Sequence, residues 1–268
     1  MQRLSRITLV LAGLCAVLML SCRPSATESQ ELDANGKSLP PLCAAARRGD
    51  ISAVKTLLAA GIDPNAADTG GTTALQYAAS SGKLAIIQAL LAKGANARAR
   101  DSVGSTALHA AAVDREVRIA ETLLDAGADV NARTKDNVTP LMASIGSPYS
   151  DAKMGLTLIR AGADVNIADS NGETALWAAI SSSSEEVAEE LLKRGADPNV
   201  QARTLGFPGY TPLHIAAMNG STNMVKLLLR YGADPAIQND TGQTALDITN
   251  VKFEEVRKLL TSRSKDGH

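Results

Sequence analysis

The chain has 268 residues, of which 3% are aromatic, and it carries 27 Lys and Arg residues against 28 Asp and Glu residues. Proteins that bind nucleic acid need a basic face for the phosphates, so this balance argues against nucleic acid as the main partner. Few aromatic residues and abundant Ala and Leu favour small, closely packed helices over one large core.

Residues 1–21 have the pattern of an export signal. Arg3 and Arg6 precede an apolar stretch at residues 7–20. This stretch is shorter than the roughly 20 residues that a helix needs to cross the hydrocarbon core of a membrane. Its length and its basic flank are those of a signal peptide. We therefore predict export from a bacterial cytoplasm and removal of residues 1–21.

The end of this segment, LMLSC at residues 18–22, resembles the cleavage motif of bacterial lipoproteins. In that family the chain is cut before the cysteine, whose thiol carries a lipid. The resemblance implies a lipid on Cys22 and attachment to a membrane, with the protein facing the periplasm or the cell surface. Met19 and Leu20 depart from the family pattern. Ordinary secretion of a soluble protein, with cleavage between residues 21 and 26, therefore stays open.

A polar stretch without an apolar period follows the cysteine, at residues 23–38. We expect residues 22–38 to be a lipid-modified cysteine with a flexible linker. Cys43 is the remaining cysteine of the mature chain. No disulfide is therefore expected within the folded domain, and its stability has to come from packing.

Two phrases recur along residues 39–262. The first phrase is an Ala-rich stretch around a leucine, and the second begins with Gly and continues with Ala, Asp and Asn. The leucines of the first phrase lie at positions 42, 75, 108, 141, 176, 213 and 246. They are therefore 33, 33, 33, 35, 37 and 33 residues apart. Units this short cannot bury an apolar face alone, so about seven are expected to stack, with the first and last as caps. Residues 263–268 form a polar tail.

Each unit carries signals for the start and end of two helices. Leucine pairs mark the second helix and are expected to be buried between units. A glycine ends that helix in a left-handed conformation. A threonine oxygen can cap the first helix from the second unit onward, at Thr73, Thr106, Thr139, Thr174, Thr211 and Thr244.

The sequence resembles the ankyrin repeat family. The stretch TPLHIAA at residues 211–217 matches the core Thr-Pro-Leu-His-x-Ala of that family, and the Gly-Ala-Asp-x-Asn close recurs in phase with it. The resemblance implies a mainly α ankyrin-repeat solenoid of helix-turn-helix units with β-hairpin loops. It also implies a monomeric domain that binds a protein through a concave face made of hairpin tips and first helices.

The histidines do not point to catalysis or to a metal site. His109 and His214 stand at the family's structural position, where the ring bonds backbone groups of neighbouring loops. Other units place Cys43, Gln76, Met142, Trp177 or Asp247 at the same position. A catalytic or metal-binding role would not vary in this way, and no His and Cys cluster has zinc spacing. We expect no catalytic residue, metal or cofactor, and a packed Trp177.

Predicted partner contacts lie at the hairpin tips and at two insertions. The tip residues singled out are Val103, Lys135, Asp136, Ser170 and Asn171, although generic solvated tips would have the same composition.

One insertion adds four residues before the threonine at position 211 and brings Phe207 and Tyr210, with Arg203, onto a long loop. We expect these three residues to form an anchor for a partner. In the alternative, Phe207 folds back onto the next repeat. The other insertion carries Tyr149, which we expect to face the concave side or its rim.

These features predict a non-enzymatic scaffold that is exported, lipid-anchored and specific for a protein partner. One version is an inhibitor or immunity protein that protects the cell from an exported toxic enzyme. Two alternatives remain open, an exported effector that binds host proteins and a structural spacer in the envelope. An enzyme grafted on the repeats would require an inserted domain or a polar cluster, and the sequence has neither.

Overall fold

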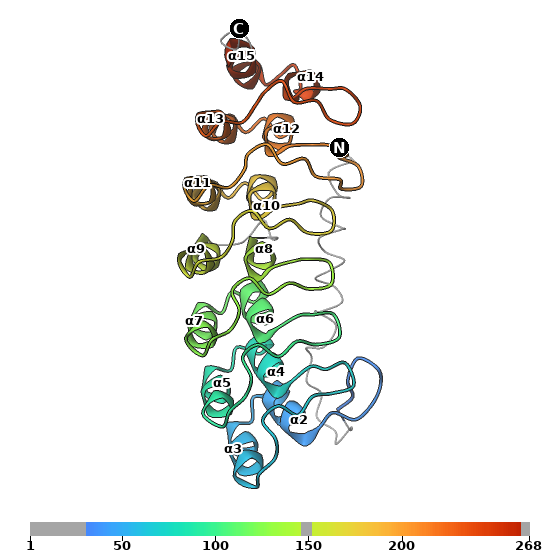
Figure 1. Ribbon diagram of the computed structural model, residues 1–268, viewed down its shortest axis with the longest axis vertical. Helices are drawn as coiled ribbons and strands as arrows, with labels where there is room; N and C mark the ends of the chain where they lie inside the picture. Colours follow the sequence, from blue (N-terminus) through green and yellow to red (C-terminus); the bar gives the residue numbers. More distant parts are fainter. Residues whose placement is uncertain (1–30, 146–151, 264–268) are drawn as a thin grey trace.

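The computed structural model describes residues 31–145 and 152–263, so the predicted signal peptide, Cys22 and Tyr149 lie outside the described residues. Within these ranges fourteen α-helices form a solenoid of seven helix pairs. Figure 1 shows three layers, which are an outer column of helices, an inner column, and loops that project beyond the inner helices. The mainly α repeat fold predicted from the sequence is confirmed.

The helices alternate between the two columns along the chain. The inner column consists of α2 (Pro41–Arg48), α4 (Ala74–Ser80), α6 (Ala107–Val113), α8 (Pro140–Ile145), α10 (Ala175–Ser181), α12 (Pro212–Met218) and α14 (Ala245–Ile248). The outer column consists of α3 (Ile51–Ala59), α5 (Leu84–Leu91), α7 (Val117–Asp125), α9 (Ala152–Arg160), α11 (Glu185–Lys193), α13 (Thr222–Arg230) and α15 (Glu254–Arg263). In the described part of the chain, no helix is both long and apolar enough to cross a membrane.

Threonines begin the inner helices, as the sequence predicts. In α6 the Thr106 hydroxyl accepts the N–H of His109, and the ring Nδ1 of His109 in turn accepts the N–H of Thr106 at 3.2 Å. This reciprocal pair satisfies two N–H groups at the helix start. Equivalent pairs begin α4, α12 and α14. Thr174 caps α10 with its hydroxyl, and Trp177 stands where the reciprocal acceptor would be.

Alanine and leucine side chains form one continuous core along the solenoid. Ala45, Ala78 and Ala111 on the inner helices are fully buried, which lets neighbouring helices approach closely. Each predicted leucine pair of the outer helices has at least one buried member, at Leu58, Leu90, Leu123 and Leu191. Burying one such side chain contributes about 1.5–3 kcal/mol. The glycines that end the outer helices have φ values of 81–89°, the left-handed conformation predicted for them.

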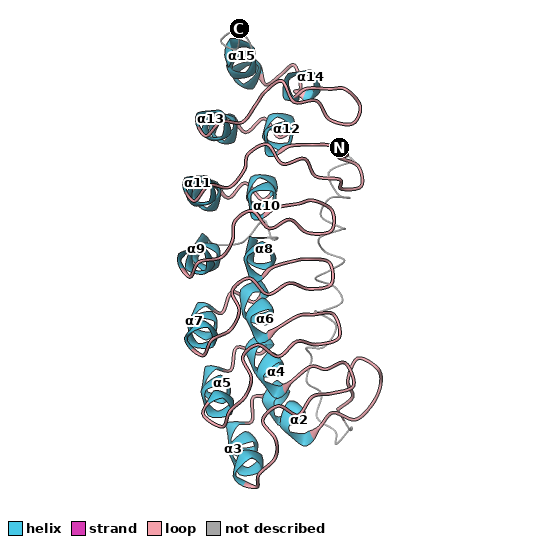
Figure 2. Ribbon diagram, in the orientation of Figure 1, coloured by secondary structure: helices cyan, strands magenta, loops and turns pink. Residues whose placement is uncertain are grey.

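The loops that enter each inner helix project as fingers (Figure 2). In the second finger, the side chain of Asp68 accepts the backbone N–H groups of Gly70 and Thr72, both at 2.8 Å. Asp33, Asp101, Asp169 and Asn239 make the equivalent pair of bonds in their own fingers. Four of the described fingers, at residues 32–38, 67–73, 168–174 and 202–210, close with a single antiparallel bridge, and these bridges are what the structure has of the predicted hairpins.

Hydrogen bonds between repeats hold the fingers in register. The backbone N–H of Ser102 donates to the carbonyl of Gly70 at 2.7 Å, linking two neighbouring fingers. At the base of the fingers, Asn166 donates to the carbonyl of Gly195 and accepts the N–H of Asp197, at 3.0 and 2.9 Å. These bonds make each repeat depend on its neighbours, as expected for a solenoid.

The folded unit starts earlier than the sequence analysis placed it. Residues 22–38 were expected to be a flexible linker, whereas residues 31–38 form a first finger with a bridge between Leu32 and Ser38. Asp33 is 8% exposed, and its carboxylate accepts two N–H groups of its own turn and the hydroxyl of Thr69. The sequence does contain this signal, because DANG at residues 33–36 has the spacing of DTGG at residues 68–71.

Candidate protein-binding surface

The fingers and the uncovered side chains of the inner helices together form one surface, which we call the inner face. The predicted tip residues Val103, Lys135, Asp136, Ser170 and Asn171 are all exposed on it. The backbone also brings them together. Lys135 N–H donates to the carbonyl of Val103 at 2.8 Å, and Ser170 N–H donates to that of Asp136 at 2.9 Å. The tips therefore form a continuous row across the third, fourth and fifth fingers.

The long finger at residues 201–210 differs from the prediction. Phe207 and Tyr210 are half-buried against the core, with their ring centroids 5.2 Å apart in an edge-to-face arrangement. The ring of Tyr210 also lies 5.2 Å from that of His214. The structure thus has the fold-back alternative for Phe207. Arg203 is exposed, and its backbone N–H donates to the carbonyl of Asn171.

The exposed large hydrophobic residue of this finger is Leu205, which is not among the residues predicted for the anchor. Its side chain is 91% exposed, next to Gly206, whose φ of 94° turns the chain back toward the core. Val103, on the third finger, is 55% exposed. Leu205 and Val103 therefore add exposed apolar surface to the row of finger tips. The rings of Phe207 and Tyr210 add less, because they pack against the core.

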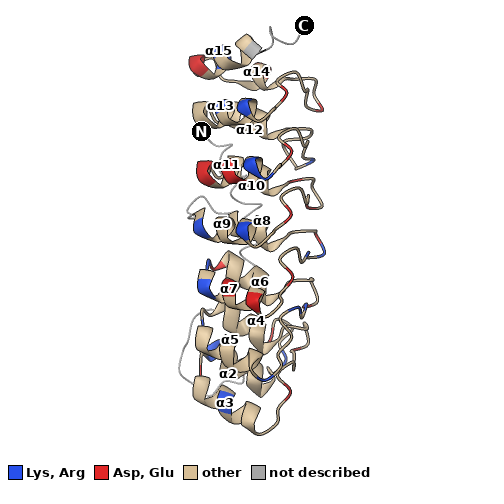
Figure 3. Cartoon of the chain, turned by 60° about the vertical axis from the view of Figure 1, so that its left-hand side comes forward, with Lys and Arg blue, Asp and Glu red and all other residues tan. Residues whose placement is uncertain are grey.

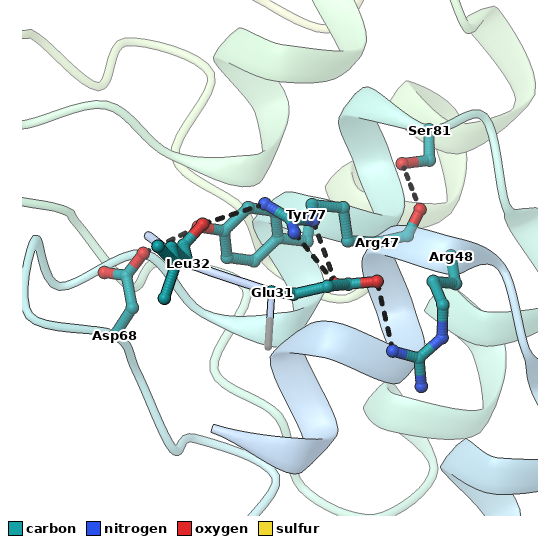
Figure 4. Close-up of polar contacts among 7 residues, drawn as sticks. All are labelled: Glu31, Leu32, Arg47, Arg48, Asp68, Tyr77 and Ser81. Atoms are coloured by element: carbon teal, nitrogen blue, oxygen red, sulfur yellow. Dashed lines mark hydrogen bonds and ion pairs between the residues drawn. The ribbon is translucent and has the colours of Figure 1, made fainter. Parts of the chain in front are cut away.

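A second cluster on the inner face lies at the first two repeats, and the sequence analysis missed it (Figure 4). Arg47 and Arg48 end helix α2, and Tyr77 of α4 lies under the guanidinium of Arg47, with 6.0 Å between the guanidinium carbon and the ring centroid. The Tyr77 hydroxyl donates to Asp68 at 2.7 Å. Other inner helices have Ala110, Ala143 or Ala178 where α4 has Tyr77, and this substitution was a signal available in the sequence.

His109 and His214 connect neighbouring repeats. Nε2 of His109 lies 3.1 Å from the carbonyl oxygen of Val138, and Nε2 of His214 lies 3.0 Å from that of Gln243. Burial lowers the pKa of His109 to about 4 and also lowers the pKa of His214. Both rings are therefore neutral at neutral pH and act as fixed links between fingers.

Cys43 and Trp177 fill the same position in their own repeats by other means. The Cys43 thiol is fully buried and lies 3.4 Å from the carbonyl oxygen of Ala66. Burial raises its pKa to about 12, so it is an unreactive thiol at neutral pH. Trp177 is 3% exposed, and its Nε1 is buried without a hydrogen-bond partner. Trp177 is therefore packed within the core.

Charge is mixed along the molecule (Figure 3). The acidic helix α11 carries its own counter-ions, with Lys193 3.0 Å from Glu189 and Arg194 3.0 Å from Glu190. Ion pairs at this level of exposure contribute little to stability. In the part of the chain that the structure describes, no group of three or more His, Cys, Asp and Glu side chains is placed to hold a metal ion.

Comparison with known proteins agrees with the geometry. The family model "Ankyrin repeats (3 copies)" matches residues 42–134 and 127–202, and the model "Ankyrin repeat" matches residues 208–240. No curated protein sequence gives a significant match.

Two solved structures illustrate the likeness in three dimensions. The human ASB11 ankyrin repeat domain is 26% identical, with a TM-score of 0.68 over 84% of this chain and 97% of that one. The ankyrin repeat domain of Bcl-3, described as a member of the IkappaB protein family, is 27% identical, with a TM-score of 0.70 over 83% of this chain and 98% of that one. Ankyrin repeat domains are scaffolds for protein–protein interaction. The family models span more than half of the chain, and the chain belongs to the ankyrin repeat family.

Proposed function

We propose that the protein is an exported, non-enzymatic scaffold, anchored to a bacterial membrane by a lipid on Cys22, that binds a partner protein through its inner face. The tips of the fingers supply the apolar part of the contact. An inhibitor or immunity protein acting on an exported enzyme is one version of this function. The partner is a protein, and neither a cofactor nor a metal takes part in binding.

The observation that carries the proposal is the tip of the long finger. This finger is four residues longer than the repeat requires, and Leu205 in its middle has a side chain that is 91% exposed. A single exposed leucine on a surface is ordinary. Here, however, the leucine lies in the additional residues of the finger and is almost entirely exposed, where a partner that crosses the fingers can bury it. Burying it in an interface would contribute about 1.5–3 kcal/mol.

The proposed tether is supported by the sequence and by the position of the first finger. The apolar stretch at residues 7–20 and the following Cys22 have the order of a lipoprotein signal. Cys22 lies nine positions before Glu31, where the described fold begins. Such a segment spans at most about 30 Å. A lipid at Cys22 would therefore keep the first repeat close to the membrane, which favours an envelope partner over delivery to a host.

Capture of the partner from the native cell envelope tests the proposal. The bait is residues 23–268, which is the mature chain without its lipid-bearing cysteine, next to variants Leu205→Ser and Val251→Ser. Val251 is 80% exposed in the turn before α15, so its replacement removes a similar apolar group away from the finger tips. We expect one protein to be captured by the parent and by Val251→Ser and to be lost, or reduced about ten-fold, with Leu205→Ser.

Other outcomes of this capture separate the alternatives. If all three baits retain the same protein equally, the contact does not involve the long finger. If none captures a protein from the envelope, the proposed envelope partner is contradicted, and the host-directed effector and the spacer become the better interpretations. Equal melting temperatures of the three baits would show that the fold is unchanged.

A further inference from the structure

Arg47 and Arg48, at the end of helix α2, together bind a single carboxylate (Figure 4). Nη2 and Nε of Arg47 lie 2.9 and 3.1 Å from Oε2 of Glu31, and Nη1 of Arg48 lies 3.1 Å from its Oε1. Both oxygens of the carboxylate are therefore engaged. Arg47 thus places two N–H groups on one oxygen and Arg48 places one on the other, and charge-assisted bonds from paired arginines favour carboxylates and phosphates. The chain itself thus shows which ligand this pair of arginines accepts.

Contacts that do not involve Glu31 also hold Arg47 in place. Its guanidinium lies over the ring of Tyr77, and its backbone carbonyl accepts the hydroxyl of Ser81 at 3.2 Å. Burial raises the pKa of Tyr77, so its hydroxyl stays protonated. This hydroxyl donates a hydrogen bond to the carboxylate of Asp68, which fixes the ring. The binding geometry is therefore prepared before any ligand arrives.

Glu31 is held by fewer independent contacts than Arg47. It lies in the extended start of the first finger, outside any helix, and its carbonyl accepts the N–H of Leu39. Its side chain is 22% exposed and that of Arg48 is 51% exposed. The pair with Arg48 is open to water and adds little to stability. In the pair with Arg47, where both side chains are about a quarter exposed, an incoming carboxylate would make the same bonds that Glu31 makes. A competing carboxylate can therefore replace Glu31 without unfolding the repeat.

We propose that Arg47 and Arg48 form a carboxylate-binding site on the inner face, that Glu31 fills it in the free protein, and that an acidic side chain of the partner displaces Glu31 on binding. The proposal deepens the function given above and rests on it for the existence of a partner.

Arg47 also indicates the form of the segment that binds. Its Nη1 donates to the carbonyl of Leu32 at 3.2 Å, so the same side chain contacts an acidic residue and the backbone carbonyl of the residue after it. Leu32 is 49% exposed, which leaves room for an apolar side chain at that position. Because Leu32 stays bridged to Ser38 when the Glu31 side chain leaves, the apolar residue of a partner would pack beside Leu32, and we assign to the site an extended partner segment that carries a Glu or Asp next to an apolar residue.

Glu31 acts as a placeholder in this arrangement. While it occupies the site, its one negative charge offsets one of the two positive charges, and it already takes up the N–H groups that another carboxylate would need. A ligand that needs the vacant site has its apparent affinity reduced by the fraction of molecules in which the site is vacant. Removal of the Glu31 charge is therefore expected to strengthen the binding of an acidic segment, whereas removal of the arginines abolishes it.

The test uses residues 23–268, the mature chain without Cys22, and a tetrapeptide as probe. The probe is acetyl-Ser-Gln-Glu-Leu-amide, which copies residues 29–32, and the control peptide has Gln in place of Glu. The NMR signal of the Arg47 Nε–H group reports occupancy of the site directly. In Glu31→Gln this signal moves, and we expect the probe to restore it saturably, about ten-fold more tightly than the probe binds the parent chain.

Two further variants make the test specific. Glu255→Gln releases Lys226 from an ion pair of 2.9 Å at the other end of the solenoid, and we expect it to create no binding of the probe. When Arg48→Ala is combined with Glu31→Gln, we expect the double variant to bind the probe at least about five-fold more weakly than Glu31→Gln alone. If Glu31→Gln alters the signals of the whole first repeat, Glu31→Ala with unchanged melting serves in its place.

Several results would overturn the proposal. The first is that the probe does not bind Glu31→Gln saturably, and the second is that the Glu and Gln peptides bind this variant equally. The third is that the probe binds the parent chain as tightly as the variant. The fourth is that the variant binds inorganic phosphate in preference to the probe. The tetrapeptide needs no partner protein. Its failure therefore leaves the finger-tip function untouched, and a failed capture from the envelope leaves the carboxylate site untouched.

Discussion

At the scale of the residue, one position on the inner helices is filled in several ways. Gln76 donates to the carbonyl of Ser105 at 3.0 Å, the same bridge to the next finger that His109 makes to Val138. Trp177 makes no such bond, because its Nε1 is buried without a partner. In these repeats the side chain at this position fills the space below the finger. Only some of them also make the hydrogen bond to the carbonyl of the next finger.

Gln76 suggests a matched replacement for His109. Burial lowers the pKa of His109 to about 4, below the 6.5 of a free histidine, so the unfolded chain takes up a proton at a higher pH than the folded one. The stability that the neutral His109 ring contributes is therefore fully present above pH 6.5, and this contribution is lost progressively as the pH falls toward 4. In His109→Gln the bridge can persist and this loss disappears.

Urea unfolding at pH 7.5 and pH 5 measures the effect. Between these two values we expect the parent chain to lose about 2 kcal/mol more than His109→Gln. The two proteins should differ by less than about 1 kcal/mol at pH 7.5. Equal losses in the parent and the variant would mean that the buried ring accepts a proton in the folded state.

At the scale of the element, the long finger shows how glycines shape the candidate site. Gly206 and Gly209 both have positive φ values, 94° and 74°. A Cβ atom on Gly209 would lie 2.6 Å from the backbone nitrogen of Asp240, whereas one on Gly206 would meet no atom within 4 Å. These two turns bring Phe207 back against Tyr210 and leave Leu205 outside.

Alanine at each glycine separates backbone strain from steric contact. Gly206→Ala adds strain alone and is expected to cost about 1 kcal/mol. Gly209→Ala adds the same strain and also displaces Asp240, whose N–H donates to the carbonyl of Pro208. We therefore expect Gly209→Ala to cost at least about 2 kcal/mol in thermal or urea unfolding. A Gly209→Ala variant as stable as Gly206→Ala would show that the finger does not pack on its neighbour as described.

The repeats could be predicted from the sequence because each signal acts within a few residues. The threonine caps, the leucine pairs and the closing glycines act within one helix or turn, and their recurrence every 33 residues repeats the information. The first finger was missed because it has no apolar period, although its Asp33 and Gly36 have the spacing of the other turns.

The candidate site was less predictable because it depends on contacts between repeats. Arg47 and Tyr77 are thirty residues apart, and only the stacking of α2 on α4 brings them together. In the long finger, the aromatic rings were expected outside because they lie in an insertion. The edge-to-face contact between Phe207 and Tyr210 reverses this, and that contact depends on the backbone angles of two glycines.

At the scale of the whole molecule, the proposed tether can be tested apart from binding. In cells given a labelled fatty acid, we expect the parent chain to take up the label and Cys22→Ser to lose it. Cys43→Ser is the matched control, because the Cys43 thiol is fully buried and is expected to carry no lipid. Equal labelling of the parent and Cys22→Ser would contradict the lipid anchor and favour ordinary secretion.

The central claim is that the finger tips contact a protein partner, and cross-linking in the living cell tests it most directly. A photoreactive amino acid is placed at position 205, on the long finger, and separately at position 251, which is similarly exposed away from the tips. We expect illumination to give one defined protein adduct from position 205 and none from position 251. No adduct from position 205, or the same adducts from both positions, would contradict the claim.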